Sequence, residues 1–253
     1  MGQADFRARM MAGERLAGTF VKTAAYEVIE VLAMSGLDFV CLDGEHSPFD
    51  RARMDACLAM AAALDFPVLV RVGSGTAENI LQALDSGAVG VVVPHVDSVA
   101  KAEEVARASR FGNGGRGYAG STRWAGFATR TMPDLLEKSQ KETIVIAQIE
   151  EPEGVDAVDD IAAVAGIDGL FAGPADLTVS YGGDAAAAEK LDQALQKIGA
   201  AANREGKAYM SFVPTAEKAR AWLDYGMTVF FIASEQGFML KAAKDEAQGL
   251  KSL

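Results

Sequence analysis

Four stretches of the chain place charged or amide side chains directly after runs of buried β-strand type. They are Asp43-Gly44-Glu45-His46, Arg71, Gln148-Ile149-Glu150 and Gly173-Pro174-Ala175-Asp176. A strand that is covered on both faces has little reason to carry arginine or glutamate unless one end of the sheet uses it. Together the four stretches predict one catalytic cluster in which carboxylates, an amide, a histidine and a guanidinium meet.

The residue inventory limits the chemistry of this cluster. The only histidines are His46 and His95, and the two cysteines, Cys41 and Cys57, are not spaced as metal ligands, so a three-histidine or thiolate zinc site is excluded. Two carboxylates, with oxygen ligands from water and substrate, suit an octahedral Mg²⁺ or Mn²⁺ ion. No lysine ends any of the four stretches, and the nearest one, Lys22, can be solvated. An imine mechanism, which needs a buried lysine amine, is therefore disfavoured.

Each residue taken alone also has a structural interpretation. Arg71 could form an ion pair with Asp43 or Glu150 that closes one end of the sheet. His46 could equally be a buried or capping histidine, and for His95 a structural role is favoured. The coincidence of all four strand ends is what favours catalysis.

Short β-type runs alternate with helical patterns along the whole sequence. The runs lie at residues 16–20, 38–43, 68–72, 89–94, 144–150, 169–172, 208–212 and 229–233. Several helical segments begin after a capping residue such as Thr76 and end at a glycine such as Gly87. Eight β/α units favour an α/β fold, a (β/α)₈ TIM barrel in a single domain over 1–253, rather than an open doubly wound sheet. The four stretches fall at the C-terminal strand ends, where such barrels carry their catalytic groups.

The composition limits the partners. The net charge is −11, from 24 basic and 35 acidic residues without a lysine or arginine cluster, so nucleic acid is not an expected partner. No apolar run approaches the ~20 residues that span a bilayer, so we expect no membrane association. Two separate cysteines predict a cytoplasmic, reducing location. Residues 111–132 are rich in glycine and irregular, which predicts a lid or an interface loop.

Five motifs resemble, in order and spacing, the HpcH/HpaI family of class II pyruvate-dependent aldolases, of the 4-hydroxy-2-oxo acid aldolase type. They are Leu-Asp-Gly-Glu-His-Ser-Pro at 42–48, Val-Leu-Val-Arg-Val at 68–72, Val-Val-Val-Pro at 91–94, Gln-Ile-Glu at 148–150 and Gly-Pro-Ala-Asp-Leu at 173–177. The resemblance covers nearly the whole chain. It implies reversible, metal-dependent aldol cleavage of a 4-hydroxy-2-oxo acid to pyruvate or hydroxypyruvate and an aldehyde.

The resemblance also implies a role for individual residues. Glu150 and Asp176 would hold a divalent metal ion, Mg²⁺, Mn²⁺ or Co²⁺. The 2-oxo acid would be oriented by Gln148, Gly173, Ala175 and Asp176. His46 would be the base, acting through a water on the metal, and Arg71 would stabilise the enolate oxygen, with Asp43 as a supporting carboxylate behind them.

An aspartate that matches Asp85 raises the basicity of this histidine in the family. Our topology places Asp85 at the end of a helix on the opposite face of the barrel, so a neighbouring subunit would have to donate it. The resemblance therefore predicts a homo-oligomer, a hexamer built as a trimer of dimers. An apolar stripe near the C-terminus, Phe238, Met239, Leu240 and Ala243, could pack on such a partner, or the final helix could pack on its own barrel.

Two alternatives remain open. One is a related barrel lyase that acts on an acyl-CoA thioester, although the sequence has no basic patch for the CoA phosphates. The other is a non-catalytic barrel that binds a 2-oxo acid, against which the retained base, oxyanion donor and metal ligands argue. The turns at 22–23 and 73–75 depart from the family pattern, and residues 116–127 match it only in part. These regions would contact the aldehyde, so the family does not predict which aldehyde is used.

Overall fold

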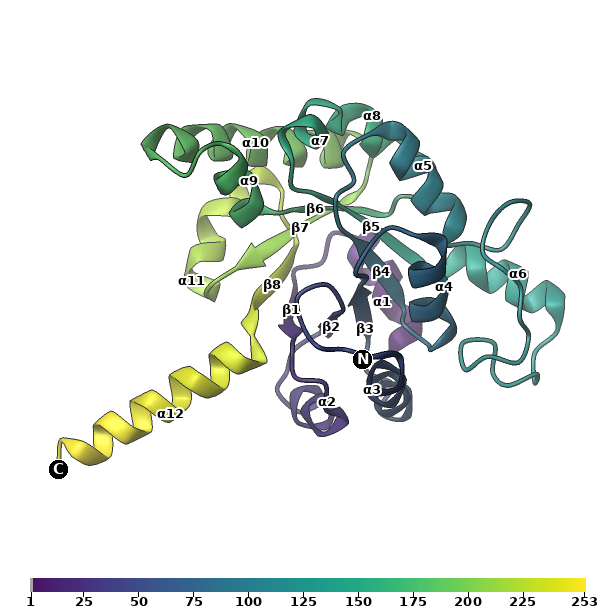
Figure 1. The fold of residues 1–253 in the computed structure, drawn as a ribbon, viewed down its shortest axis with the longest axis horizontal. Helices are drawn as coiled ribbons and strands as arrows, with labels where there is room; N and C mark the ends of the chain where they lie inside the picture. The colour runs from purple at the N-terminus through teal and green to yellow at the C-terminus, as the bar shows by residue number, and fades with distance from the viewer. Residues whose placement is uncertain (1) are drawn as a thin grey trace.

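Eight parallel strands close on themselves into a barrel in the order β1 to β8 in the computed structural model, which describes residues 2–253 (Figure 1). The strands are β1 (Leu16–Val21), β2 (Phe39–Asp43), β3 (Val68–Arg71), β4 (Gly90–Val93), β5 (Ile144–Ile149), β6 (Gly169–Ala172), β7 (Ala208–Val213) and β8 (Val229–Ser234). The predicted TIM barrel is confirmed, and every strand lies within one residue of its expected bounds.

Helices surround this barrel. They are α1 (Gln3–Met11), α2 (Tyr26–Ala33), α3 (Arg51–Ala63), α4 (Ala77–Asp85), α5 (Val99–Ala108), α6 (Met132–Lys141), α7 (Pro152–Asp156), α8 (Val158–Ala163), α9 (Pro174–Ser180), α10 (Ala185–Arg204), α11 (Ala216–Ala219), the 3₁₀ helix η1 (Arg220–Tyr225) and α12 (Glu235–Lys251). Thr76 and Asp184 cap α4 and α10 through their side chains, as the capping preference of these residues predicts. None of the helices within residues 2–253 is long and apolar enough to cross a membrane.

Aromatic rings fill the centre of the barrel. Phe20, Phe39, Phe171 and Phe231 contact one another with ring centroids 4.9 to 6.1 Å apart. Gly18 leaves room for this cluster, since a Cβ there would lie 2.4 Å from the Phe39 ring. These rings fill the interior of the barrel, so a ligand can bind only outside it, at the C-terminal ends of the strands.

The segment between α5 and α6 is irregular, as predicted, and extends with α6 to one side of the barrel (Figure 1). It is nevertheless anchored. The Arg116 guanidinium lies over the rings of Phe111 and Trp124, 4.7 Å from each centroid, and donates hydrogen bonds to Asp85 at the end of α4. The cation–π contacts thus hold the segment together, and the charged hydrogen bond to Asp85 ties it to α4 on the N-terminal side of the barrel.

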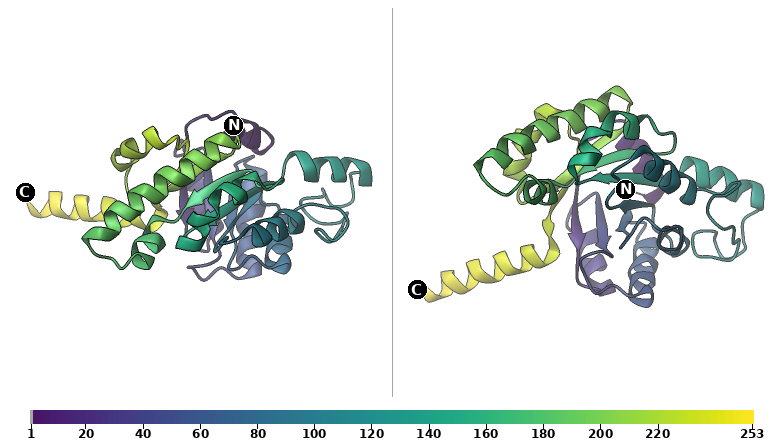
Figure 2. Two further views of the ribbon diagram at one scale, coloured as in Figure 1. Left: turned by 90° about the horizontal axis from the view of Figure 1, so that it is seen from above. Right: turned by 45° about the horizontal axis from the view of Figure 1, so that its top comes forward.

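Helix α12 leaves the barrel and points away from it (Figures 1 and 2). Every residue of α12 after Glu235 is exposed, including Phe238, Met239 and Leu240. An isolated helix of this length is marginally stable in water unless one face packs against something. The expected alternative, a final helix that packs on its own barrel, is not what this structure shows.

Candidate active site

A cavity of about 520 Å³ opens at the C-terminal ends of the strands. Its lining includes six of the predicted site residues: His46, Arg71, Gln148, Gly173, Ala175 and Asp176. Phe20 and Phe171 of the central aromatic cluster form part of its wall. The fold therefore brings together residues that are up to 130 positions apart, counted from His46 to Asp176.

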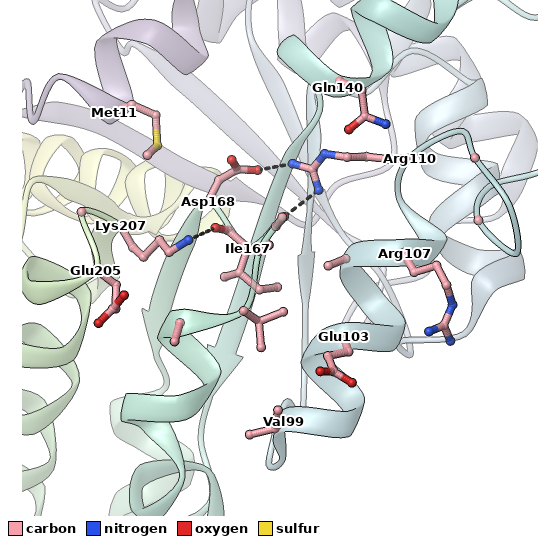
Figure 3. Close-up of a pocket in the computed structure, with 18 of the residues that line it drawn as sticks. Met11, Val99, Glu103, Arg107, Arg110, Gln140, Ile167, Asp168, Glu205 and Lys207 are labelled. Atoms are coloured by element: carbon pink, nitrogen blue, oxygen red, sulfur yellow. Dashed lines mark hydrogen bonds and ion pairs between the residues drawn. The ribbon is translucent and has the colours of Figure 1, made fainter.

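A larger pocket of about 1230 Å³ lies at the opposite end of the barrel, before the starts of β6 and β7 (Figure 3). None of the predicted site residues lines it. Four of its charged groups are paired with protein atoms: Asp168 accepts from Arg7 and Arg110, and Lys207 donates to the Ile167 carbonyl. These pairs join loops at the N-terminal end, which in TIM barrels mainly serves stability, so we place the active site in the smaller cavity.

Asp43 is the centre of the hydrogen-bond network below the cavity. Its side chain is fully buried, and its carboxylate faces Arg71 on the neighbouring strand, with Nε–Oδ1 3.0 Å and Nη2–Oδ2 2.8 Å. It also accepts from the main-chain N–H groups of Glu45 and His46. Lys22 Nζ lies 2.8 Å from Oδ2. One carboxylate thus orients the guanidinium and the turn that carries the histidine.

Burial raises the pKa of Asp43, but the charge of Arg71 and the bond from Lys22 outweigh it, so the net pKa lies below its ordinary value. Asp43 is therefore an anion near neutral pH. The ion pair between Arg71 and Asp43, which the sequence allowed as a purely structural contact, does form. The Arg71 guanidinium nonetheless also lines the cavity, so the pair positions a group that can meet a ligand.

Glu150 is a second buried carboxylate next to the cavity. One oxygen accepts from the main-chain N–H of His95 at 2.8 Å, and the other accepts from the Gln148 amide. The side-chain oxygen Oε1 of Gln148 is buried without a hydrogen-bond partner. Burial raises the pKa of Glu150, and the charge of Asp176 raises it further. Two carboxylates that repel each other beside an unpaired amide oxygen are a suitable donor set for a hard cation.

Glu150 also belongs to a second group of possible metal ligands. Ligand atoms of Glu45, His95 and Glu150 all lie within 4.8 Å of one another. His95 has a left-handed φ of 57°, and burial lowers its pKa, although the nearby acids outweigh this and raise it. Glu45 and His95 belonged to no predicted metal set, because no single-sequence signal shows that the turns after β2 and β4 meet.

The structure separates two residues that the resemblance links. The His46 side chain is 60% exposed at the cavity, and Glu45 is the acid near it, with Nε2–Oε2 3.8 Å. Asp85 ends α4, which runs back toward the N-terminal end of the barrel, and it is bonded to Arg116. Within one chain, Asp85 and His46 therefore lie at opposite ends.

Lys22, which the sequence allowed to be solvated, is a residue of the cavity. Its side chain is 32% exposed and lines the cavity. Its main-chain N–H donates to the buried Glu235 carboxylate at the start of α12, as does that of Thr23. A carboxylate 213 residues away along the chain holds this loop, which no local pattern could reveal.

The fold and site define a (β/α)₈-barrel enzyme with an acidic and a basic wall around one cavity. The sequence model of the HpcH/HpaI aldolase/citrate lyase family matches residues 16–242. The chain belongs to this family, as its motifs predicted, and it is a carbon–carbon lyase.

Individual relatives agree with this assignment. The 5-keto-4-deoxy-D-glucarate aldolase of Enterobacter sp. (strain 638) is 34% identical, over 97% of this chain and 96% of its own. The hydroxypyruvate/pyruvate aldolase of Paraburkholderia phytofirmans is 31% identical, over 97% of both chains. A crystal structure of a HpcH/HpaI aldolase/citrate lyase family protein from Burkholderia cenocepacia J2315 has a TM-score of 0.91 and 30% identity, covering 98% of this chain and 99% of that one.

The Asp43 network predicts a pH-dependent contribution to stability. A carboxyl with a lowered folded-state pKa stabilises the protein above its unfolded pKa of about 4, and this contribution is lost as the pH falls through the folded pKa. Asp43→Asn should reduce the free energy of unfolding near pH 7 by about 3 kcal/mol, because it removes the carboxylate that lies closest to the buried Arg71 and leaves only Glu45 near its guanidinium. The difference from the unsubstituted protein should shrink toward pH 3. Urea unfolding at several pH values measures it.

The matched control is Asp224→Asn, which neutralises an exposed acid and should change stability by less than about 0.5 kcal/mol. A loss in Asp43→Asn that is as small as in the control would contradict the central role of this carboxylate.

Proposed function

We propose that this chain catalyses the metal-dependent, reversible aldol cleavage of a 4-hydroxy-2-oxo acid to pyruvate or hydroxypyruvate and an aldehyde. The observation that carries the proposal is the meeting of Gln148, Asp176, Arg71 and His46 in one cavity, with Glu150 directly beside it. The aldolase names of the relatives at 31–34% identity support it.

Glu150 and Asp176 would hold the divalent ion, Mg²⁺, Mn²⁺ or Co²⁺. When bound there, the ion would act as a Lewis acid toward the carboxylate and 2-oxo group of the substrate. The Gln148 carbonyl oxygen, buried without a partner, is available to the ion or its water. Gly173 permits this packing, because a Cβ there would lie 2.7 Å from the Glu150 Cβ.

Residues of this chain would carry out the remaining steps. Gly173, Ala175 and Asp176, at the start of α9, would orient the 2-oxo acid through their main chain. His46, acting through a water, would take up the proton of the 4-hydroxyl group, and the bond between C3 and C4 would break to release the aldehyde. The electron pair moves to the 2-oxo oxygen, where the Arg71 guanidinium, fixed by Asp43, stabilises the developing charge. His46 would then return this proton, to C3 of the enolate, which completes the 2-oxo acid and restores the neutral imidazole.

Arg71→Lys tests whether the guanidinium is catalytic or only structural. An ammonium can keep a charge next to Asp43 but cannot reproduce the planar fork that also reaches the cavity. We expect turnover to fall about 10²- to 10³-fold, as on loss of an oxyanion donor. Steady-state kinetics and thermal unfolding should be measured together. Near-normal turnover would show that Arg71 only closes the barrel.

Direct metal binding tests the donor set. Glu150→Gln and Asp176→Asn should each weaken Mg²⁺ binding at least about tenfold in calorimetry, since one carboxylate with waters holds a hard ion poorly. His46→Ala should keep the affinity and lose turnover, because this base is not a ligand. Chelator should abolish cleavage, and Mg²⁺, Mn²⁺ or Co²⁺ should restore it.

His95→Gln distinguishes the two possible donor sets. If Glu150 and Asp176 are the ligands, the Mg²⁺ affinity of this variant should stay close to that of the unsubstituted protein. Loss of affinity in His95→Gln with retention in Asp176→Asn would place the ion between Glu45, His95 and Glu150 instead. Full activity in chelator would contradict the metal proposal altogether.

We propose further that the chain forms a homo-oligomer, expected to be a hexamer, in the cytoplasm. The support is α12, whose apolar residues are exposed over its whole length, and Asp85, which lies too far from His46 within one chain to assist it. Association would bury α12 on a neighbouring copy and would bring a second chain's Asp85 toward the His46 of the first.

Opposite faces of α12 provide a matched test of association. Met239→Glu would place a charge on the apolar stripe, while Gln248→Glu would place the same charge nine residues later, on the opposite side of the helix. Sedimentation should show smaller species for Met239→Glu and an unchanged assembly for Gln248→Glu. A stable, fully active monomer of the unsubstituted chain would remove both the association and the role of Asp85.

A further inference from the structure

Residues 112–115, with the sequence Gly-Asn-Gly-Gly, follow α5 at the start of the irregular segment and have no role in the proposed function. We call them the glycine loop. Its base is fixed, because the Phe111 N–H donates to the Ser139 hydroxyl at 2.9 Å and the Arg116 N–H donates to the Arg110 carbonyl at 2.9 Å. Between these anchors, the first three residues of the loop are exposed. An exposed tip on a fixed base can react without any unfolding of the barrel.

Asn113 and Gly114 are the one Asn-Gly pair of the chain. In such a pair the backbone nitrogen of the glycine can attack the side-chain carbonyl carbon of the asparagine, which closes a five-membered ring. Glycine favours this attack, because it has no Cβ that would crowd the nitrogen and its backbone angles are little restricted. The attack needs a backbone nitrogen that is not held in a hydrogen bond and free space around it.

The structure fulfils both conditions at this pair. Within residues 2–253, the N–H of Gly114 has no protein acceptor. Apart from the adjacent residues, a Cβ built at Gly114 would have one neighbour within 4 Å, the Cδ atom of Arg107 at 3.8 Å. The Gly114 nitrogen is therefore free to approach the Asn113 side chain.

The other asparagines of the chain, Asn79 and Asn203, do not fulfil these conditions. They lie inside α4 and α10, where the backbone N–H groups are hydrogen-bonded. The N–H that follows Asn79, that of Ile80, donates to the Thr76 carbonyl at 3.1 Å. A helix also holds the backbone away from the geometry that ring closure requires. The fold thus protects two asparagines and leaves Asn113 open.

We propose that Asn113 is a site of spontaneous deamidation, which gives the glycine loop an aspartate or an isoaspartate. The Gly114 nitrogen forms a bond to the side-chain carbonyl carbon of Asn113, and the bond from this carbon to the amide nitrogen breaks. The proton of the Gly114 N–H leaves with that nitrogen as ammonia. Water, the only co-reactant, then opens the cyclic imide. Opening at the side-chain carbonyl gives aspartate, and opening at the main-chain carbonyl gives isoaspartate.

Either product adds a negative charge to the large pocket at the N-terminal end of the barrel. Asn113 and Arg107 both line this pocket, and Figure 3 shows Arg107. Arg107 lies against Gly114, so the new carboxylate has a cation near it. The isoaspartyl form also adds one atom to the main chain inside the turn that the Gly115 N–H closes on the Gly112 carbonyl at 3.1 Å. The reaction therefore changes the charge of the loop and, in one product, its length.

Peptide mapping of protein aged at mildly alkaline pH tests the proposal. The tryptic peptide 111–116 should gain about 1 Da as the amide becomes a carboxylate. This reaction should be at least about tenfold faster than the same change in peptides 72–101 and 198–204, which carry the helical asparagines. The rate in the folded protein should lie within about threefold of the rate in the urea-unfolded chain, because the fold leaves the loop open.

Asn113→Gln should abolish the mass shift and the isoaspartate that an isoaspartyl carboxyl methyltransferase labels, since a longer side chain would have to close a six-membered ring. The matched control is Asn79→Gln, which should keep both signals. A greater slowing by the fold, or a smaller advantage over the helical asparagines, would overturn the proposal. Label that stays in Asn113→Gln and disappears in Asn79→Gln would also overturn it, because the reaction would then lie in α4.

Discussion

A single buried carboxylate, Asp43, joins the parts of this molecule that have to act together. It neutralises Arg71 on the next strand, holds the main chain of the turn that carries His46, and contacts Lys22, which follows the neighbouring strand β1. Removing a charge of this kind from water is favourable only when partners surround it on all sides. Because those partners come from β1, β2 and β3, the same contacts that compensate Asp43 also set the distances between the functional groups of one wall of the cavity.

The other wall is built on an opposite principle. Asp176 lies close enough to Glu150 to help raise the pKa of Glu150, and the side-chain amide of Gln148 keeps a buried oxygen without a partner. Such an arrangement costs stability in the isolated chain and is useful when a cation and an anionic substrate arrive together. The charge of Arg71 on the basic wall of the cavity is thus already balanced by Asp43. The charges of Glu150 and Asp176 on the acidic wall are balanced only when a cation binds.

The barrel and the membership of the cavity could be predicted from the sequence because both follow from local patterns. Apolar runs mark the strands, and parallel strands bring their C-terminal ends, with Arg71 and Gln148, to one place. The contacts of Lys22 with Glu235 and of Glu45 with His95 could not be predicted in this way. They depend on how loops from distant strands fold over the mouth, and loop geometry has no periodicity to read. The free course of α12 is likewise a tertiary property, since its sequence is that of an ordinary amphipathic helix.

The central claim is that this cavity removes a proton from the methyl group of a bound 2-oxo acid with the help of a divalent ion and without an imine. Exchange of the pyruvate methyl protons in D₂O, followed by proton NMR without any aldehyde, tests it most directly. We expect the methyl signal to decay when enzyme and Mg²⁺ are both present and chelator to stop the decay. A persistent signal with Mg²⁺, or a decay that continues unchanged in chelator, would contradict it.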